Sequence, residues 1–193
     1  MTIIVGVHDP ENHETWIGTD RRTTEDNLNL DPMRPHPLPP KWVIAGRWVI
    51  ASAGDVAVID LYRQHATELA LCPDVRSLTH KMREFIAADP HMSWNSKNEG
   101  SLQTAELEGL IGSSDGLWAW GADFYPLPMS AWTQGSGGSV GLGALWAAQD
   151  LDLPYLAWCE LAIQAATRFK PDTCGGQPAV GYMGLDGWTT VRA

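Results

Sequence analysis

The residue with the clearest chemical potential is Thr2, at the start of the apolar, β-branched run Met1-Thr2-Ile3-Ile4-Val5-Gly6-Val7. Removal of Met1 would give Thr2 a free α-amine, with a reference pKa of about 7.7–8.0, beside its own hydroxyl. The hydroxyl could then attack as a nucleophile while the amine accepts its proton. Met-Thr is also an ordinary way for a chain to begin, so this residue pair alone is weak evidence for catalysis.

Two charged residues can reach Thr2 through the strands that the sequence predicts. Residues 1–7 are typical of a buried strand, and 15–20 run back as its hairpin partner, which returns Asp20 to the neighbourhood of Thr2. A carboxylate there could hold a lysine or the terminal amine in position, although Asp20 could also be a turn former at a strand end. Lys41 begins the next predicted strand, either as an edge lysine with its ammonium in solvent or as a buried cation that tunes a neighbour.

A fourth polar candidate is Ser136, within the run Gly135-Ser136-Gly137-Gly138 ahead of a predicted helix. A glycine-rich turn at a helix N-terminus can bind anions, but this run matches neither GxxxxGK[ST] nor GxGxxG, so we discount nucleotide binding. Ser136 could instead point back into a site. The glycines would let the helix and the sheet approach closely.

The remaining pattern predicts hairpins and helices that would position these residues. Strands are expected at 41–45, 47–51, 106–112, 117–120, 129–133, 179–183 and 188–191, and helices at 55–70, 75–88, 138–146 and 155–169, with Asp74 as the N-cap of the second helix. The segment 21–40 is unusually long for a loop, which indicates a functional or mobile segment. Two helix pairs separated by antiparallel strands predict an α+β architecture of two stacked sheets with helices outside.

Composition narrows the class of protein. A chain of 193 residues with 44% hydrophobic and 19% charged residues is expected to form one globular domain over 1–193. The net charge of −10 argues against nucleic acid or an anionic membrane as partner, and the lack of a long apolar run or basic leader favours a cytoplasmic location. The three cysteines form no CxxC pair and the six histidines show no metal-ligand spacing, so we expect no disulfide framework, metal or cofactor.

Taken in order, the motifs resemble the proteasome β-subunit superfamily of N-terminal nucleophile (Ntn) hydrolases, especially its bacterial HslV-like branch. Each motif is short, but five in the right order over nearly the whole length are specific. They are Met-Thr-Ile-Ile-Val-Gly-Val at the start, Ile17-Gly18-Thr19-Asp20, Ala51-Ser52-Ala53-Gly54-Asp55, Gly135-Ser136-Gly137-Gly138 and Asp172-Thr173-Cys174-Gly175-Gly176.

The resemblance implies a four-layer αββα sandwich and a threonine-type peptidase that works through an acyl-enzyme on Thr2. Asp20 and Lys41 would be the charged pair beside Thr2, and Ser136 would hydrogen-bond its amine. The remaining roles implied by the resemblance are an acid at Asp172 and an oxyanion-binding backbone N–H near Ala51 or Ser52. The resemblance further implies a homo-oligomeric ring that degrades proteins or peptides, and it allows an ATP-dependent unfoldase as partner.

Two other functions stay open at this point. One is an Ntn amidohydrolase of the same fold that acts on a small amide. The other is a non-catalytic, proteasome-like assembly subunit in which Met1 is retained and blocks Thr2. Turnover of peptides and of small acyl-amides separates these functions from the peptidase.

Overall fold

A computed structural model describes residues 2–21, 24–25, 28–29, 40–54, 56–89 and 107–192. Over these residues the chain forms two antiparallel five-stranded sheets and five α-helices, which confirms the α+β class. The first sheet has the order β10-β1-β2-β11-β12, with bounds Ala131–Gln134, Ile4–Asp9, Glu14–Thr19, Ala179–Gly184 and Gly187–Arg192. The second has the order β5-β6-β7-β8-β9, with bounds Trp42–Ala45, Trp48–Ala53, Glu108–Ser113, Gly116–Trp120 and Leu127–Met129.

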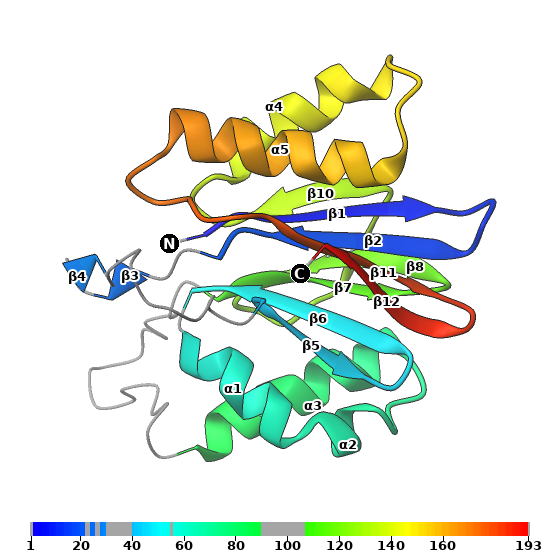
Figure 1. The fold of residues 1–193 in the computed structure, drawn as a ribbon. Coiled ribbons are helices and arrows are strands. Elements are labelled where there is room, and N and C mark those ends of the chain that lie inside the picture. Colours follow the sequence, from blue (N-terminus) through cyan, green and yellow to red (C-terminus); the bar gives the residue numbers. More distant parts are fainter. Residues whose placement is uncertain are drawn as a thin grey trace.

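The helices flank the two sheets (Figure 1). Helices α4 (Gly138–Gln149) and α5 (Tyr155–Phe169) lie over the first sheet, whereas α1 (Val56–Gln64), α2 (Ala66–Leu69) and α3 (Val75–Ala88) lie under the second. A separate ribbon of β3 (Thr24–Glu25) and β4 (Leu28–Asn29) belongs to the long predicted loop. The rest of that loop between 22 and 39, and residues 90–106 between α3 and β7, are outside the described residues.

Alternation along β1 decides which side chains enter which layer. Ile4 packs between the two sheets with Val49 and Leu110, whereas Ile3 and Val5 pack against α4 and α5. Successive side chains of an extended chain point to opposite faces of a sheet. Thr2, two residues before Ile4, therefore directs its side chain towards the second sheet.

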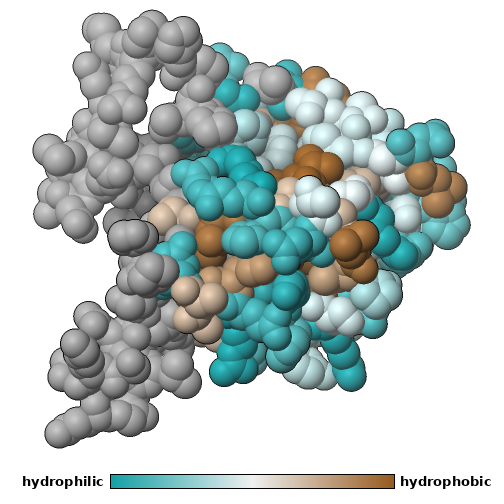
Figure 2. Space-filling model, turned by 90° about the horizontal axis from the view of Figure 1, so that it is seen from below, coloured by the Kyte–Doolittle hydropathy of each residue, from teal (hydrophilic) through white to brown (hydrophobic). Residues whose placement is uncertain are grey.

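The two helical layers are packed with side chains of different size. The layer of α1, α2 and α3 contacts its sheet through large residues, among them Trp48, Tyr62, Met82, Trp120 and Phe124. The layer of α4 and α5 uses smaller ones, among them Cys159, Ala162 and Ala166. Figure 2 shows that the outer face of the α1–α3 side is mainly hydrophilic, with hydrophobic residues scattered over it.

Two predicted elements are each divided in the structure. The helix expected at 55–70 is broken at His65, whose ring stacks on Phe85 with 3.9 Å between ring centroids, and it becomes α1 and α2. The strand expected at 129–133 is broken at Ser130. Its first part, β9, pairs with β8 of the second sheet, and its second part, β10, pairs with β1 of the first. The predicted N-cap is confirmed, because the Asp74 carboxylate accepts a hydrogen bond from Ser77 N–H at 2.7 Å.

Candidate active site

Thr2 lies where the first hairpin opens, and the residue is 3% exposed. Its Oγ1 donates a hydrogen bond to Asp20 Oδ1 at 2.5 Å and contacts Lys41 Nζ as well. The hairpin accounts for the first contact: β1 and β2 pair Ile4 with Thr19, so the next pair outward is Ile3 with Asp20, joined by Asp20 N–H to Ile3 O at 3.2 Å. The structure thus brings Thr2, Asp20 and Lys41 together.

Asp20 is a fully buried carboxylate whose two oxygens are both used. Oδ1 accepts hydrogen bonds from Ile3 N–H at 3.1 Å and from Lys41 Nζ at 2.7 Å, in addition to the Thr2 hydroxyl. Oδ2 accepts one from Gly175 N–H at 3.0 Å. Several hydrogen bonds and an ammonium are what an ionised carboxylate needs when it is removed from water.

Lys41 comes from the other sheet. It precedes β5, and its carbonyl accepts a hydrogen bond from Ser52 N–H at 3.3 Å, which fixes the chain at this point. Its ammonium forms an ion pair with Asp20, and the lysine side chain is only 13% exposed. Burial lowers the pKa of Lys41, and the negative charge of Asp20 opposes this effect. Lys41 is therefore a buried cation beside Asp20 and not an edge lysine with its ammonium in solvent.

The turn that contains Ser136 wraps around the backbone of Thr2. Thr2 N–H donates to Ser136 Oγ at 3.2 Å, Ser136 Oγ–H donates to Thr2 O at 3.3 Å, and Gly137 N–H donates to the same carbonyl at 3.2 Å. Gly135 has a φ of +93°, and a Cβ added there would lie 2.3 Å from Thr2 O. Only glycine allows this turn to approach Thr2 so closely.

The other predicted site residues are placed differently. Asp172 is exposed on the turn after α5, and none of the hydrogen bonds or ion pairs among the described residues joins it to Thr2. Ala51 lies within β6 between Trp42 and Leu110, so its N–H belongs to the sheet, and the N–H of Ser52 is already bonded to Lys41. Use of either amide as an oxyanion donor would require giving up a backbone hydrogen bond. The roles of Asp172, Ala51 and Ser52 stay predictions.

Three residues near Thr2 were not assigned to the site from the sequence. Gly175 contributes its N–H to Asp20, and Glu108 Oε1 accepts a hydrogen bond from Gly135 N–H at 2.7 Å. Cys174 is buried, and a Cβ added at Gly137 would lie 2.6 Å from its Sγ. Burial raises the pKa of the Cys174 thiol, so it is neutral near pH 7. Cys174 and Gly175 belong to the motif 172–176 and could have been found through it, whereas Glu108 lies in no motif and gives no local signal of its position.

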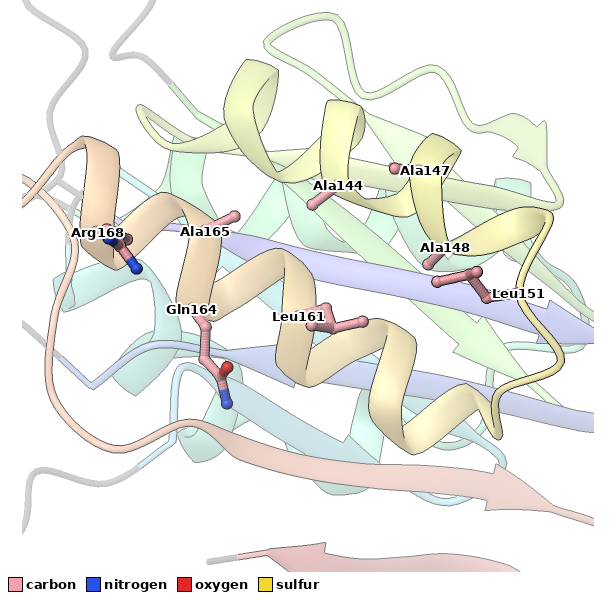
Figure 3. Close-up of a pocket in the computed structure, with 8 residues that line it drawn as sticks. All are labelled: Ala144, Ala147, Ala148, Leu151, Leu161, Gln164, Ala165 and Arg168. Atoms are coloured by element: carbon pink, nitrogen blue, oxygen red, sulfur yellow. The ribbon is translucent and has the colours of Figure 1, made fainter.

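Among the described residues there is no group of three or more His, Cys, Asp or Glu side chains that could hold a metal ion. In the same part of the chain, no helix has the length and apolar character needed to cross a membrane. A shallow groove of about 420 Å³ lies apart from Thr2, between α4 and α5. Figure 3 shows its lining, which is mainly alanine and leucine, with Arg168 at one end and Leu151 at the other.

No family model matches the chain, and no curated protein matches it by sequence. Among solved structures, it is similar to BPH of Thiobacillus denitrificans in complex with epoxomicin, with a TM-score of 0.73 and 20% identity over 95% of this chain and 99% of that one. A second structure of that BPH gives a TM-score of 0.72 and 21% identity, over 96% and 98% of the two chains. Eukaryotic HslV from Trypanosoma brucei gives 0.65 and 16%, over 95% and 99%. The chain therefore has the fold of HslV, as its resemblance to the HslV-like Ntn hydrolases predicted.

Proposed function

We propose that the protein is a threonine-type, proteasome-like peptidase, built as a single αββα Ntn-hydrolase domain over residues 1–193. The observation that supports this most directly is the contact of a buried threonine hydroxyl with both a carboxylate and an ammonium, those of Asp20 and Lys41. The fold that the chain shares with BPH and HslV supports the same class of reaction. The proposed catalytic group needs no metal and no cofactor.

In the proposed reaction, removal of Met1 frees the α-amine of Thr2, next to Ser136 Oγ. The amine takes the proton of Oγ1 as this oxygen attacks the carbonyl carbon of a peptide bond. It then gives the proton to the leaving amine as the C–N bond breaks, which leaves an ester on Thr2. Water hydrolyses the ester, and the proton of the water returns to Oγ1 through the amine.

Lys41 and Asp20 would set the protonation state of this amine. A lysine ammonium close to the amine lowers the amine's pKa by like-charge repulsion, so that the amine can act as a base near pH 7. Asp20 would keep Lys41 charged against the effect of its burial. With Met1 retained, the Thr2 nitrogen is an amide without useful basicity, and the chain would be folded but inactive.

We also propose that the protein acts as a homo-oligomer, as a ring that encloses its sites. The support is the α4–α5 face, which we define by its exposed residues Gly143, Trp146, Ala147, Leu161, Gln164 and Arg168. Helix α4 contains no charged residue, and Trp146 on its outer side is 70% exposed. A helix that is apolar on all sides is normally covered. Protein or peptide substrates, a cytoplasmic location and an ATP-dependent unfoldase as partner are the remaining parts of this proposal.

Hydrolysis of a panel of fluorogenic peptides, combined with the intact mass of the subunit, tests the catalytic proposal. Molecules that begin at Thr2 should be active, whereas Thr2→Ala and Lys41→Ala should be folded and inactive. Thr189→Ala, on the exposed strand β12, is the control and should keep the wild-type rate. Full activity in molecules that all retain Met1 would contradict the proposal. Turnover of small acyl-amides alone would favour the amidohydrolase, and no turnover of either would favour the assembly subunit.

A further inference from the structure

Glu108 is a charged residue in the layer between the two sheets. It begins β7 and lies opposite Ala53, at the end of the second sheet that is nearest Thr2. Glu108, Leu110 and Gly112 alternate onto one face of β7, and Leu110 belongs to the apolar cluster between the sheets. A carboxylate in such a layer needs a polar partner, because removing it from water is costly.

The partner of Glu108 belongs to the opposite sheet. Its Oε1 accepts a hydrogen bond from Gly135 N–H at 2.7 Å, a length typical of a charge-assisted hydrogen bond. Gly135 follows β10 and begins the turn Gly135–Gly137, which ends at α4. The carboxylate therefore ties this turn to the second sheet at the point where the turn starts.

The same turn holds the backbone of Thr2. Three hydrogen bonds, at 3.2 to 3.3 Å, join Ser136 and Gly137 to the N–H and the carbonyl of Thr2. Asp20 and Lys41 hold the Thr2 hydroxyl from the other side. The turn therefore holds the backbone of Thr2, including its nitrogen, while the ion pair holds its hydroxyl.

We propose that Glu108 is a positioning residue, which anchors the turn Gly135–Gly137 and through it fixes the nitrogen of Thr2 in the site. The catalytic consequence of this inference depends on the proposed function. Glu108 acts through the turn and needs no contact with substrate. The negative charges of Glu108 and Asp20 favour the protonated form of the free amine, and the positive charge of Lys41 opposes them. The neutral thiol of Cys174 adds no charge.

Two variants separate the hydrogen bond from the charge. Glu108→Gln keeps an oxygen that can accept from Gly135 N–H but removes the charge, whereas Glu108→Leu removes both. Glu160→Leu is the matched control, because Glu160 is also half-buried and forms an ion pair, with Arg192 at 2.9 Å, on the outer side of the first sheet. We would measure hydrogen–deuterium exchange of the segment 135–138, and peptide hydrolysis by full-length protein that begins at Thr2, as a function of pH.

In Glu108→Leu we expect faster exchange confined to the turn and a fall in kcat/KM of about tenfold, since a hydrogen bond to a charged group is lost. Glu108→Gln should exchange like the wild type and keep its rate at high pH. The acidic limb of its pH–rate profile should move to lower pH, because loss of a negative charge favours the neutral form of the Thr2 amine. Glu160→Leu should change neither the exchange of the turn nor the pH profile.

Unchanged exchange of the turn in Glu108→Leu would overturn the inference, whatever the activity. Faster exchange spread over the whole chain, with a pH profile like that of the wild type in both Glu108 variants, would also overturn it, because this is what a general loss of stability produces. A wild type without Thr2-dependent hydrolysis would instead overturn the proposed function. Hydrogen–deuterium exchange of the turn in Glu108→Leu would then still decide whether Glu108 anchors the turn.

Discussion

The two helical layers of the molecule cover similar sheets in opposite ways. On the α1–α3 side, large aromatic residues such as Trp48 and Trp120 fill the space under the second sheet, and the outer face is mainly hydrophilic. On the α4–α5 side, alanine, glycine and cysteine bring the helices close to the first sheet, and helix α4 contains no charged residue on its outer side. The α1–α3 side therefore presents a mainly polar face to solvent (Figure 2), whereas the α4–α5 side shapes the site and exposes the uncharged helix α4.

The greatest loss of stability should come from the α1–α3 side, where large side chains fill the core. Trp120 is 1% exposed, and its ring contacts Phe124 and Tyr62. Trp120→Ala should leave a cavity and lower the free energy of unfolding by about 3–5 kcal/mol. Urea denaturation of the variant measures this loss. A loss below about 1 kcal/mol would mean that this side does not depend on its aromatic filling.

The second prediction tests whether another subunit packs on the α4–α5 face. Trp146→Asp should weaken self-association by about 2 kcal/mol or more, because a desolvated tryptophan is a typical anchor of an interface. Leu71→Asp is the matched control, since Leu71 is 79% exposed beside α2 on the opposite side. Sedimentation velocity at micromolar concentration should show smaller particles for Trp146→Asp alone. A wild type that sediments as a clean monomer would contradict the ring.

The third effect tests whether the α4–α5 side depends on small residues. A Cβ added at Gly137 would lie 2.9 Å from Ala166 Cβ and 2.6 Å from Cys174 Sγ. Gly137→Ala should therefore cost about 1–3 kcal/mol by overpacking and reduce activity by displacing the turn at Thr2. Gly143→Ala, on the α4–α5 face, is the control for overpacking within the subunit, because no atom of the subunit lies within 4 Å of the added one. We expect it to stabilise the subunit by about 0.5–1 kcal/mol, as alanine usually does in a helix.

How much the sequence could predict depends on how local each signal was. The hairpin that brings Asp20 to Thr2 follows from a β-branched apolar run, and the helix 155–169 follows from helical spacing. Short windows of sequence contain both signals. The break at Ser130 could not be seen, because both parts of 129–133 have strand character and only the two sheets distinguish them. Glu108 looks like the solvent side of an alternating strand. Its actual position depends on the sheet that packs over it.

A buried thiol on the α4–α5 side should make stability depend weakly on pH. Burial raises the pKa of Cys159 from 9.0 to about 12, so the thiol ionises in the unfolded chain before it does so in the folded one. The unfolded state therefore binds fewer protons between these values, and stability falls as the pH rises above 9. This group should remove about 1.4 kcal/mol by pH 10. Urea denaturation at pH 8 and pH 10 should show a smaller loss for Cys159→Ala than for the wild type. Equal losses would exclude this thiol as the cause.

The hydrogen bonds of Asp20 determine when, during synthesis of the chain, the site can be complete. Two of its partners, Thr2 and Lys41, are near the start of the chain, but another, Gly175, comes 155 residues after Asp20. Synthesis on the ribosome proceeds from the N-terminus at roughly 5–20 residues per second. The threonine emerges first, but one oxygen of the carboxylate beside it lacks its backbone partner until residue 175 has been made. A nascent chain thus carries Thr2 for most of its synthesis before the hydrogen bonds around Asp20 can all be formed.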